Sequence, residues 1–214
     1  AHLQFYEISD DREGWAFSLY LLMETYLMPR QNAIIFDYSK IRKKGEPIRG
    51  IGGVASGPEP LMELHDRVRQ FFNCFYRIQK EGMSPKESIL MMLRWMLKYE
   101  KSNPKELVTS TIAEVEAMDG SLKTYGHTRL MFDVFNSIPV CVAAGNLGRS
   151  SQIGIVDISD HEFLTMKDIT INPERFNVYS ISHMSNNSID VDNPAKNDLV
   201  AKTLPKYILK NGEP

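Results

Sequence analysis

The stretch from residue 33 to residue 62 constrains the fold of this chain more than any other part of the sequence. It opens with the apolar run 33–36, whose two isoleucines favour a β-strand. A charged turn follows, then the glycine-rich run 50–53, and then Ser-Gly-Pro-Glu-Pro at residues 56–60. Proline suits the first turn of a helix, because a backbone N–H has no helical partner there in any case. The order of these features predicts a strand, a flexible loop and a long helix in succession.

The loop between this strand and this helix has the composition of a ligand-binding loop. Glycines let the backbone approach a ligand closely, and a helix start presents free N–H groups and the positive end of the helix dipole. Both properties suit a phosphate group. An ordinary connection from strand to helix has the same composition, so the two interpretations stay open.

Capping residues mark two further helices. Asp10 or Asp11 can cap a helix that Pro29 ends, and Ser84 with Glu87 has the spacing of a capping box. Helical periodicity places these apolar residues on one face of the first helix: Trp15, Leu19, Leu22, Met23 and Tyr26.

The remaining elements are predicted from hydrophobic periodicity. We expect helices at about 60–80, 85–100, 104–118, 128–144 and 194–210, and a brief acidic helix capped by Asp160. The apolar run 151–156 predicts a strand, and the alternating residues 175–191 predict extended chain.

Composition excludes several classes of protein. With 214 residues and 43% hydrophobic residues, the chain can fill a core, and a net charge of −2 argues against non-specific binding to nucleic acid or to a membrane surface. Its two cysteines lack CxxC spacing, its five histidines lack metal-ligand spacing, and no apolar run approaches a membrane span of about 20 residues. The N-terminus does not resemble a signal peptide, and we expect a cytoplasmic globular protein whose two ends are cut points within a larger fold.

Several collinear motifs resemble one enzyme family. They are Asp-Arg-Glu-Gly-Trp at 11–15, the stretch 33–62, Ala-Gly-Asn-Leu-Gly-Arg-Ser at 144–150, the acidic segment 160–167, Ser-Asn-Asn-Ser at 185–188 and the final Asn-Gly-Glu-Pro. In this order they resemble the catalytic chain of the monomeric, adenosylcobalamin-dependent (class II) ribonucleotide reductases. The resemblance covers most of the chain except roughly residues 80–126, which we interpret as a helical insertion.

The resemblance implies a fold and a binding role. The expected fold is α/β, a single segment (1–214) from the first half of the family's ten-stranded α/β barrel. The loop that matches residues 51–60 lies, in that family, between the ribonucleotide substrate and a deoxynucleotide effector and decides which base is accepted. The implied substrate- and effector-binding residues are Gly52, Gly53, Ser56, Gly57, Pro58, Glu59, Arg149, Asn186 and Asn187. For Arg149 a structural salt bridge, and for the two asparagines backbone capping, are equally good explanations.

The family's radical chemistry needs residues that this sequence lacks. The motif Asn-Pro-Cys-Gly-Glu, which carries the radical cysteine, is absent from it. Cys74 and Cys141 do not match the family's redox cysteines, and we expect both to be buried small apolar residues. We therefore assign no catalytic residue and no metal site to this chain. Adenosylcobalamin is implied by resemblance alone and would need the rest of the enzyme.

Three functional hypotheses remain open at this point. The first is a segment of a ribonucleotide reductase that makes deoxyribonucleotides together with a complementary chain carrying the catalytic cysteines. The second is a reductase homologue that binds nucleotides without catalysis, and the third is a purely structural homologue. An exposed sheet edge with an apolar face would favour the first hypothesis, because an incomplete barrel leaves both uncovered.

Overall fold

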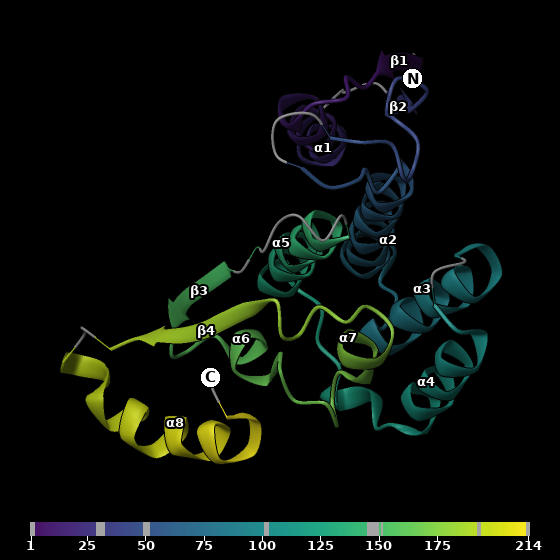
Figure 1. The fold of residues 1–214 in the computed structure, drawn as a ribbon. Coiled ribbons are helices and arrows are strands. Elements are labelled where there is room, and N and C mark those ends of the chain that lie inside the picture. Colours follow the sequence, from purple (N-terminus) through teal and green to yellow (C-terminus); the bar gives the residue numbers. More distant parts are fainter. Residues whose placement is uncertain are drawn as a thin grey trace. The chain divides into compact units, whose positions relative to one another are not determined.

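The computed structural model describes residues 3–28, 33–48, 52–100, 103–144, 150, 152–191 and 194–212 (Figure 1). Helices and strands alternate along much of the chain, which agrees with the expected α/β class. The elements in chain order are β1 (Leu3–Glu7), α1 (Arg12–Leu27), β2 (Ala33–Asp37), α2 (Glu59–Glu81), α3 (Pro85–Tyr99), α4 (Lys105–Ala117), η1 (Gly120–Leu122), α5 (His127–Ala143), β3 (Gln152–Asp157), α6 (His161–Thr165), α7 (Pro173–Asn177), β4 (Ser185–Asp190), η2 (Pro194–Lys196) and α8 (Asn197–Asn211).

Contacts within the chain define two compact units. The first comprises residues 1–69 and 140–149, and the second comprises residues 70–139 and 150–214. Helix α2 contributes its first half to one unit and its second half to the other. The expected insertion at 80–126 corresponds to α3, α4 and η1 in the second unit, and its status as an insertion stays a prediction.

The first unit is built on a β–α–β arrangement. Strands β1 and β2 pair in parallel, from Leu3 opposite Ala33 to Glu7 opposite Asp37, and α1 connects them. The side chain of Asp11 caps α1 by accepting a hydrogen bond from the Gly14 N–H, as predicted. Strand β1 was not predicted from the sequence.

The two faces of this small sheet differ in burial. Ile34 and Phe36 are buried, whereas Phe5 on the opposite face keeps 74% of its surface exposed. The predicted face of α1 is also rotated, because Ser18 and Leu22 are buried while Tyr26 is exposed. A serine can occupy a buried position when its hydroxyl has hydrogen-bond partners, and periodicity of apolar residues cannot anticipate that.

Helices dominate the first half of the second unit. Helix α3 begins with the predicted capping box, in which the Ser84 side chain accepts from the Glu87 N–H and the Glu87 carboxylate accepts from the Ser84 N–H. Its residues Met92 and Met96 are buried, whereas Met91 is 42% exposed. Helix α3 packs on α4, and α4 contacts α7 (Figure 1).

The second sheet pairs β3 with β4 in parallel, from Gln152 opposite Ser185 to Asp157 opposite Asp190 (Figure 1). The prediction of extended chain over 175–191 was wrong in its first half, because α7 occupies Pro173–Asn177 and only β4 is a strand. Proline at the start of α7 favours a helix. Residues of this helix also form buried ion pairs, which hold the helix against the core.

Within the described residues each sheet has two strands. Both pairs are parallel, as a piece of an α/β barrel requires, but the ten-stranded barrel itself is not confirmed.

Candidate functional site

Backbone hydrogen bonds join residues 45–48 to residues 53–55, at the start of the loop 51–60 that the resemblance implies is a specificity loop. The Gly45 N–H donates to the Ala55 carbonyl (2.9 Å), the Ala55 N–H to Glu46 (2.8 Å) and the Ile48 N–H to Gly53 (3.1 Å). Residues Gly52 and Gly53 have φ angles of +77° and +98°, a region that glycine adopts without strain. The pairing thus fixes residues 53–55 at the start of this loop, and Gly52 and Gly53 hold backbone conformations that other residues avoid.

The start of α2 is less suited to phosphate than its sequence suggested. The Pro58 carbonyl already accepts from the N–H groups of Leu61 and Met62, and Pro60 has no N–H. In addition, the Glu59 carboxylate folds back against Gly57, whose φ is +85°. A carboxylate at this position repels an anion, so the loop backbone is a better candidate for ligand contact than the helix end.

The two predicted asparagines lie on opposite faces of β4, because side chains alternate along a strand. Asn187 is buried, and its Oδ1 accepts a hydrogen bond from the Ser185 hydroxyl (2.9 Å), to which the Asn136 amide also donates (3.1 Å). Asn186 is exposed. Of the two, only Asn186 has an exposed side chain.

The predicted site residues fall into separate parts of the chain. Gly52, Gly53, Ser56, Gly57, Pro58 and Glu59 belong to the first unit, and Asn186 and Asn187 belong to the second. Arg149 lies outside the described residues.

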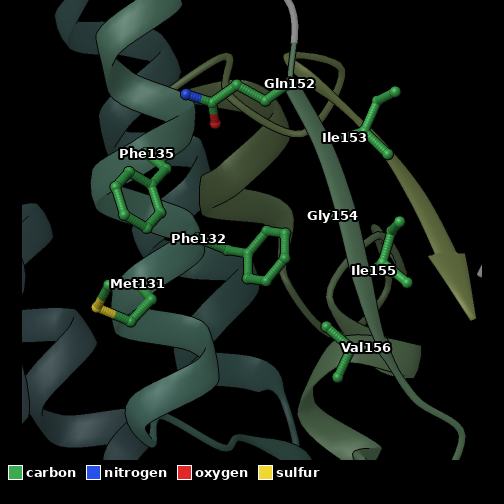
Figure 2. Close-up of a pocket in the computed structure, with 8 residues that line it drawn as sticks. All are labelled: Met131, Phe132, Phe135, Gln152, Ile153, Gly154, Ile155 and Val156. Atoms are coloured by element: carbon green, nitrogen blue, oxygen red, sulfur yellow. The ribbon is translucent and has the colours of Figure 1, made fainter. Parts of the chain in front are cut away.

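An open apolar hollow of about 460 Å³ lies between α5 and β3 in the second unit (Figure 2). Its walls are Met131, Phe132, Phe135, Gln152, Ile153, Gly154, Ile155 and Val156. The ring of Phe132 points at β3 and fills the place of a Gly154 side chain, while Ile153 and Ile155 point to the other side of the strand (Figure 2). A Cβ at position 154 would overlap that ring, so a larger residue there would require the Phe132 side chain to move.

Both cysteines are buried, as predicted. Burial raises the pKa of the Cys74 thiol and of the Cys141 thiol to about 12. A thiol with so high a pKa is protonated at neutral pH and is a poor nucleophile and a poor redox centre.

A buried histidine links three elements of the first unit. The Ser18 hydroxyl donates to the Trp15 carbonyl (2.8 Å), so its oxygen accepts from the Nε2–H of His65 (3.1 Å). The Nδ1 atom of His65 then accepts from the Tyr38 hydroxyl (2.7 Å). Burial first, and the nearby Arg69 charge second, lower the pKa of His65 to about 3, so the ring is neutral. Sequence reasoning treated this histidine as isolated, since its partners are distant in sequence.

A network of buried ions lies at the centre of the second unit. Asp133 accepts from Arg129 (2.8 Å) and Arg175 (2.7 Å), and Glu174 accepts from Lys123 (2.7 Å) and Arg129 (2.9 Å). No side chain among them is more than 2% exposed. Burial raises the pKa of the Glu174 carboxyl, but the charges of Lys123 and Arg129 outweigh it and hold that pKa below its usual value. The spacing of Arg129 and Asp133 on one helix was the only sequence sign of this network.

Two further features bear on the kind of site. Among the residues that the structure describes, no three His, Cys, Asp or Glu side chains are placed to hold a metal ion. In the same part of the chain, no helix is long and apolar enough to cross a membrane.

Comparison with known proteins gives a consistent result. A family model described as B12-dependent ribonucleotide reductase, insertion domain, matches residues 1–72. The chain is 33% identical to a Dictyostelium discoideum protein named "Probable adenosylcobalamin-dependent ribonucleoside-triphosphate reductase", and the match covers 97% of this chain and 20% of that protein. It is 30% identical to the adenosylcobalamin-dependent ribonucleoside-triphosphate reductase of Euglena gracilis, over 97% of this chain and 21% of the relative.

A solved structure has a similar fold. The crystal structure of a B-12 dependent (class II) ribonucleotide reductase matches 99% of this chain and 22% of its own chain, with a TM-score of 0.52 and 22% identity. The family model describes residues 1–72 as an insertion domain, so the expected place of residues 33–62 in the barrel is not confirmed. The chain is a relative of the adenosylcobalamin-dependent, class II ribonucleotide reductases, as its motifs indicated, and it spans about a fifth of the length of the relatives it matches.

Proposed function

We propose that this chain is a segment of an adenosylcobalamin-dependent reductase that converts ribonucleoside triphosphates into deoxyribonucleotides by radical chemistry. The observation that carries the proposal is the similarity over 97% of the chain to proteins named as such reductases. In this proposal the chain contributes substrate and effector recognition, and another segment contributes the radical cysteine.

The open edge of the second sheet supports a place within a larger sheet. The Gln152 N–H donates to the Met184 carbonyl, so Gln152, Gly154 and Val156 direct their backbone groups to β4. Ile153 and Ile155 therefore direct theirs to the other edge, where the described residues provide no strand. Unpaired edges with exposed apolar side chains are typical of a sheet that further strands complete.

The loop is the part of the chain to which we assign base discrimination. Its start is held by the backbone pairing of residues 53–55, and Gly52, Gly53 and Gly57 have positive φ. A bound effector can then select among a few loop conformations, and each conformation offers the substrate a different surface. In this role Gly52, Gly53, Ser56, Gly57, Pro58 and Glu59 affect specificity and not the radical step.

Cobalamin belongs, in this proposal, to the remainder of the enzyme. The hollow beside β3 has one polar lining side chain, Gln152, whereas the amide-rich rim of a corrin needs many hydrogen-bond partners. The lining of this hollow therefore does not fit the cofactor, and we assign it no contact there. The cofactor supplies the radical when bound, and the buried thiols of Cys74 and Cys141 take no part in it.

Ribonucleotide reduction tests the proposal directly. The assay uses adenosylcobalamin and a dithiol, first with this chain alone and then with a chain that carries the remaining reductase sequence. We expect deoxyribonucleotide only in the mixture, because the radical cysteine motif is absent from these 214 residues. Inactivity of the mixture, with both chains folded, would favour a homologue that binds nucleotides without catalysis or serves a structural role.

Replacing Gly52 by alanine is expected to change the relative kcat/KM values for the bases in the active mixture. Its φ is +77° and a Cβ there would contact nothing within 4 Å, so the substitution acts on the backbone conformation alone. An alanine at positive φ costs about 1 kcal/mol, enough to shift the loop populations several-fold.

Gly82→Ala is the matched control for this substitution. Gly82 has a φ of +69°, also with nothing within 4 Å, but it lies between α2 and α3. Equal base preferences in the Gly52 variant and the wild type would contradict the assigned role of the loop.

A further inference from the structure

One buried histidine connects the segment before the glycine-rich loop to the helix after it. Tyr38 directly follows β2 at the start of the segment 38–48, and His65 lies in the first two turns of α2. The Tyr38 hydroxyl donates to Nδ1 of His65 (2.7 Å), and the Nε2–H of the same ring donates to the Ser18 hydroxyl on α1 (3.1 Å). The ring therefore joins three elements of the first unit, two of which flank the loop.

The histidine ring is held in one orientation. His65 is 1% exposed and Ser18 is fully buried. The ring of Phe36, on β2, lies against the imidazole with 4.5 Å between the ring centroids. Because the Ser18 hydroxyl gives its proton to the Trp15 carbonyl, Nε2 carries the ring proton and Nδ1 is left as the acceptor for Tyr38. Each hydrogen bond in this chain thus has a fixed direction.

Other hydrogen bonds of the segment 38–48 reach different parts of the unit. The Arg42 guanidinium donates to the Asp10 carboxylate, and both side chains are partly exposed, so the pair contributes little to rigidity. Residues 45–48 pair with residues 53–55, which belong to the loop and move with it. The hydrogen bond of Tyr38, by contrast, ends on a buried ring of α2.

The choice of base by a loop depends on how many conformations the loop has. A segment whose ends are held gives up less freedom when a ligand fixes it, so one conformation is selected more completely. If the segment before the loop can shift against α2, the loop gains conformations that accept every base. An effector then directs the choice less well, because those conformations dilute the selective ones.

Resting on the proposed function, we propose that Tyr38 and His65 are positioning residues of the loop. Their hydrogen bond fixes the segment 38–48 against α2, and the choice of base that the effector directs depends on it. The radical step does not depend on this hydrogen bond, and neither side chain touches the nucleotide.

The first test is Tyr38→Phe in the active mixture, with one deoxynucleotide effector at a time. The measured quantity is the ratio of kcat/KM for the favoured base to kcat/KM for the other bases. We expect this ratio to fall about fivefold, because a hydrogen bond favours one arrangement by about that factor. Tyr20→Phe is the matched control, since it removes the hydroxyl that donates to Glu24 on the exposed side of α1, and it should leave the ratio unchanged.

Two substitutions of His65 separate positioning from a general effect on stability. In His65→Asn the amide oxygen replaces Nδ1 and can still accept from Tyr38. In His65→Gln the amide N–H replaces Nε2–H, so the contact with Ser18 is kept and the acceptor for Tyr38 is lost. Both variants should lower the thermal midpoint, because both replace a buried ring. Only His65→Gln should lower the kcat/KM ratio as Tyr38→Phe does.

The remaining outcomes distinguish this inference from the proposed function. A wild-type ratio in Tyr38→Phe, with an altered ratio in Gly52→Ala, would overturn the inference and leave the role of the loop intact. Equal ratios in His65→Asn and His65→Gln would also overturn it, because the hydrogen bond to Tyr38 would then have no effect on the choice of base. An inactive wild-type mixture would remove the proposed function, and this inference with it.

Discussion

Replacing Asp133 by asparagine is expected to lower the free energy of unfolding by about 3–5 kcal/mol. The Asp133 carboxylate is fully buried and accepts hydrogen bonds from Arg129 and Arg175. Asparagine keeps the shape but removes the charge, so two buried guanidinium groups are left with too little compensation. A loss of this size is a large fraction of the stability of a typical domain. Urea unfolding at neutral pH measures it.

Two further variants separate the charge effect from a general effect of substitution. Glu116→Gln breaks the ion pair with Arg94, whose side chains are 49% and 58% exposed, and should change stability by less than about 1 kcal/mol. Adding Arg175→Gln to Asp133→Asn should recover part of the loss, because it removes one of the uncompensated charges. A change below about 1 kcal/mol in Asp133→Asn would contradict a structural role for the network.

The stability of the protein is expected to fall steeply as the pH drops from about 6.5, because of His65. In the unfolded chain this histidine takes up a proton near its ordinary pKa of 6.5, whereas its pKa in the fold is about 3. Between these two values the unfolded state binds the extra proton, so acid favours unfolding. One proton of difference corresponds to a slope of about 1.4 kcal/mol per pH unit, and the contribution is fully present above pH 6.5.

Urea unfolding of the wild type and of His65→Gln across pH 4–7 measures this slope. Other groups add to the wild-type pH dependence, among them Glu174, whose lowered pKa also makes acid destabilising. The difference between the two proteins isolates His65: the variant should lose the part of the slope below pH 6.5 whatever its absolute stability. Parallel curves would show that His65 titrates normally in the fold.

Helices and strands were predicted well where the signal for them lies within one short segment of the sequence. The capping residues Asp11 and Ser84, the strand before the glycine loop and the strand at β3 all lie close to their predicted positions. Each depends on neighbours in sequence, which is why the sequence suffices. Strand β1 was not predicted, because no turn signal on the N-terminal side of its five residues marks where it starts.

The candidate site was predicted less completely, because much of it depends on orientation. The sequence singled out Asn186 and Asn187 together, and the pairing of β4 with β3 separates an exposed amide from a buried one. The positive φ angles of Gly52, Gly53 and Gly57 were found only in the structure. The position of the Glu59 carboxylate beside Gly57 could not be predicted, because the spacing of residues in a sequence does not specify the direction of a side chain.

The sequence by itself determined the family resemblance, the positions of most helices and strands, and the burial of both cysteines, because motifs, periodicity and apolar character are local properties. Tertiary structure alone decided which face of α1 is buried, that residues 173–177 form a helix, and which charged residues lie in the core. Buried polar groups are stable only when partners distant in sequence meet them, as Ser18 meets His65 and Asp133 meets Arg175. The packing of the fold brings these partners into contact.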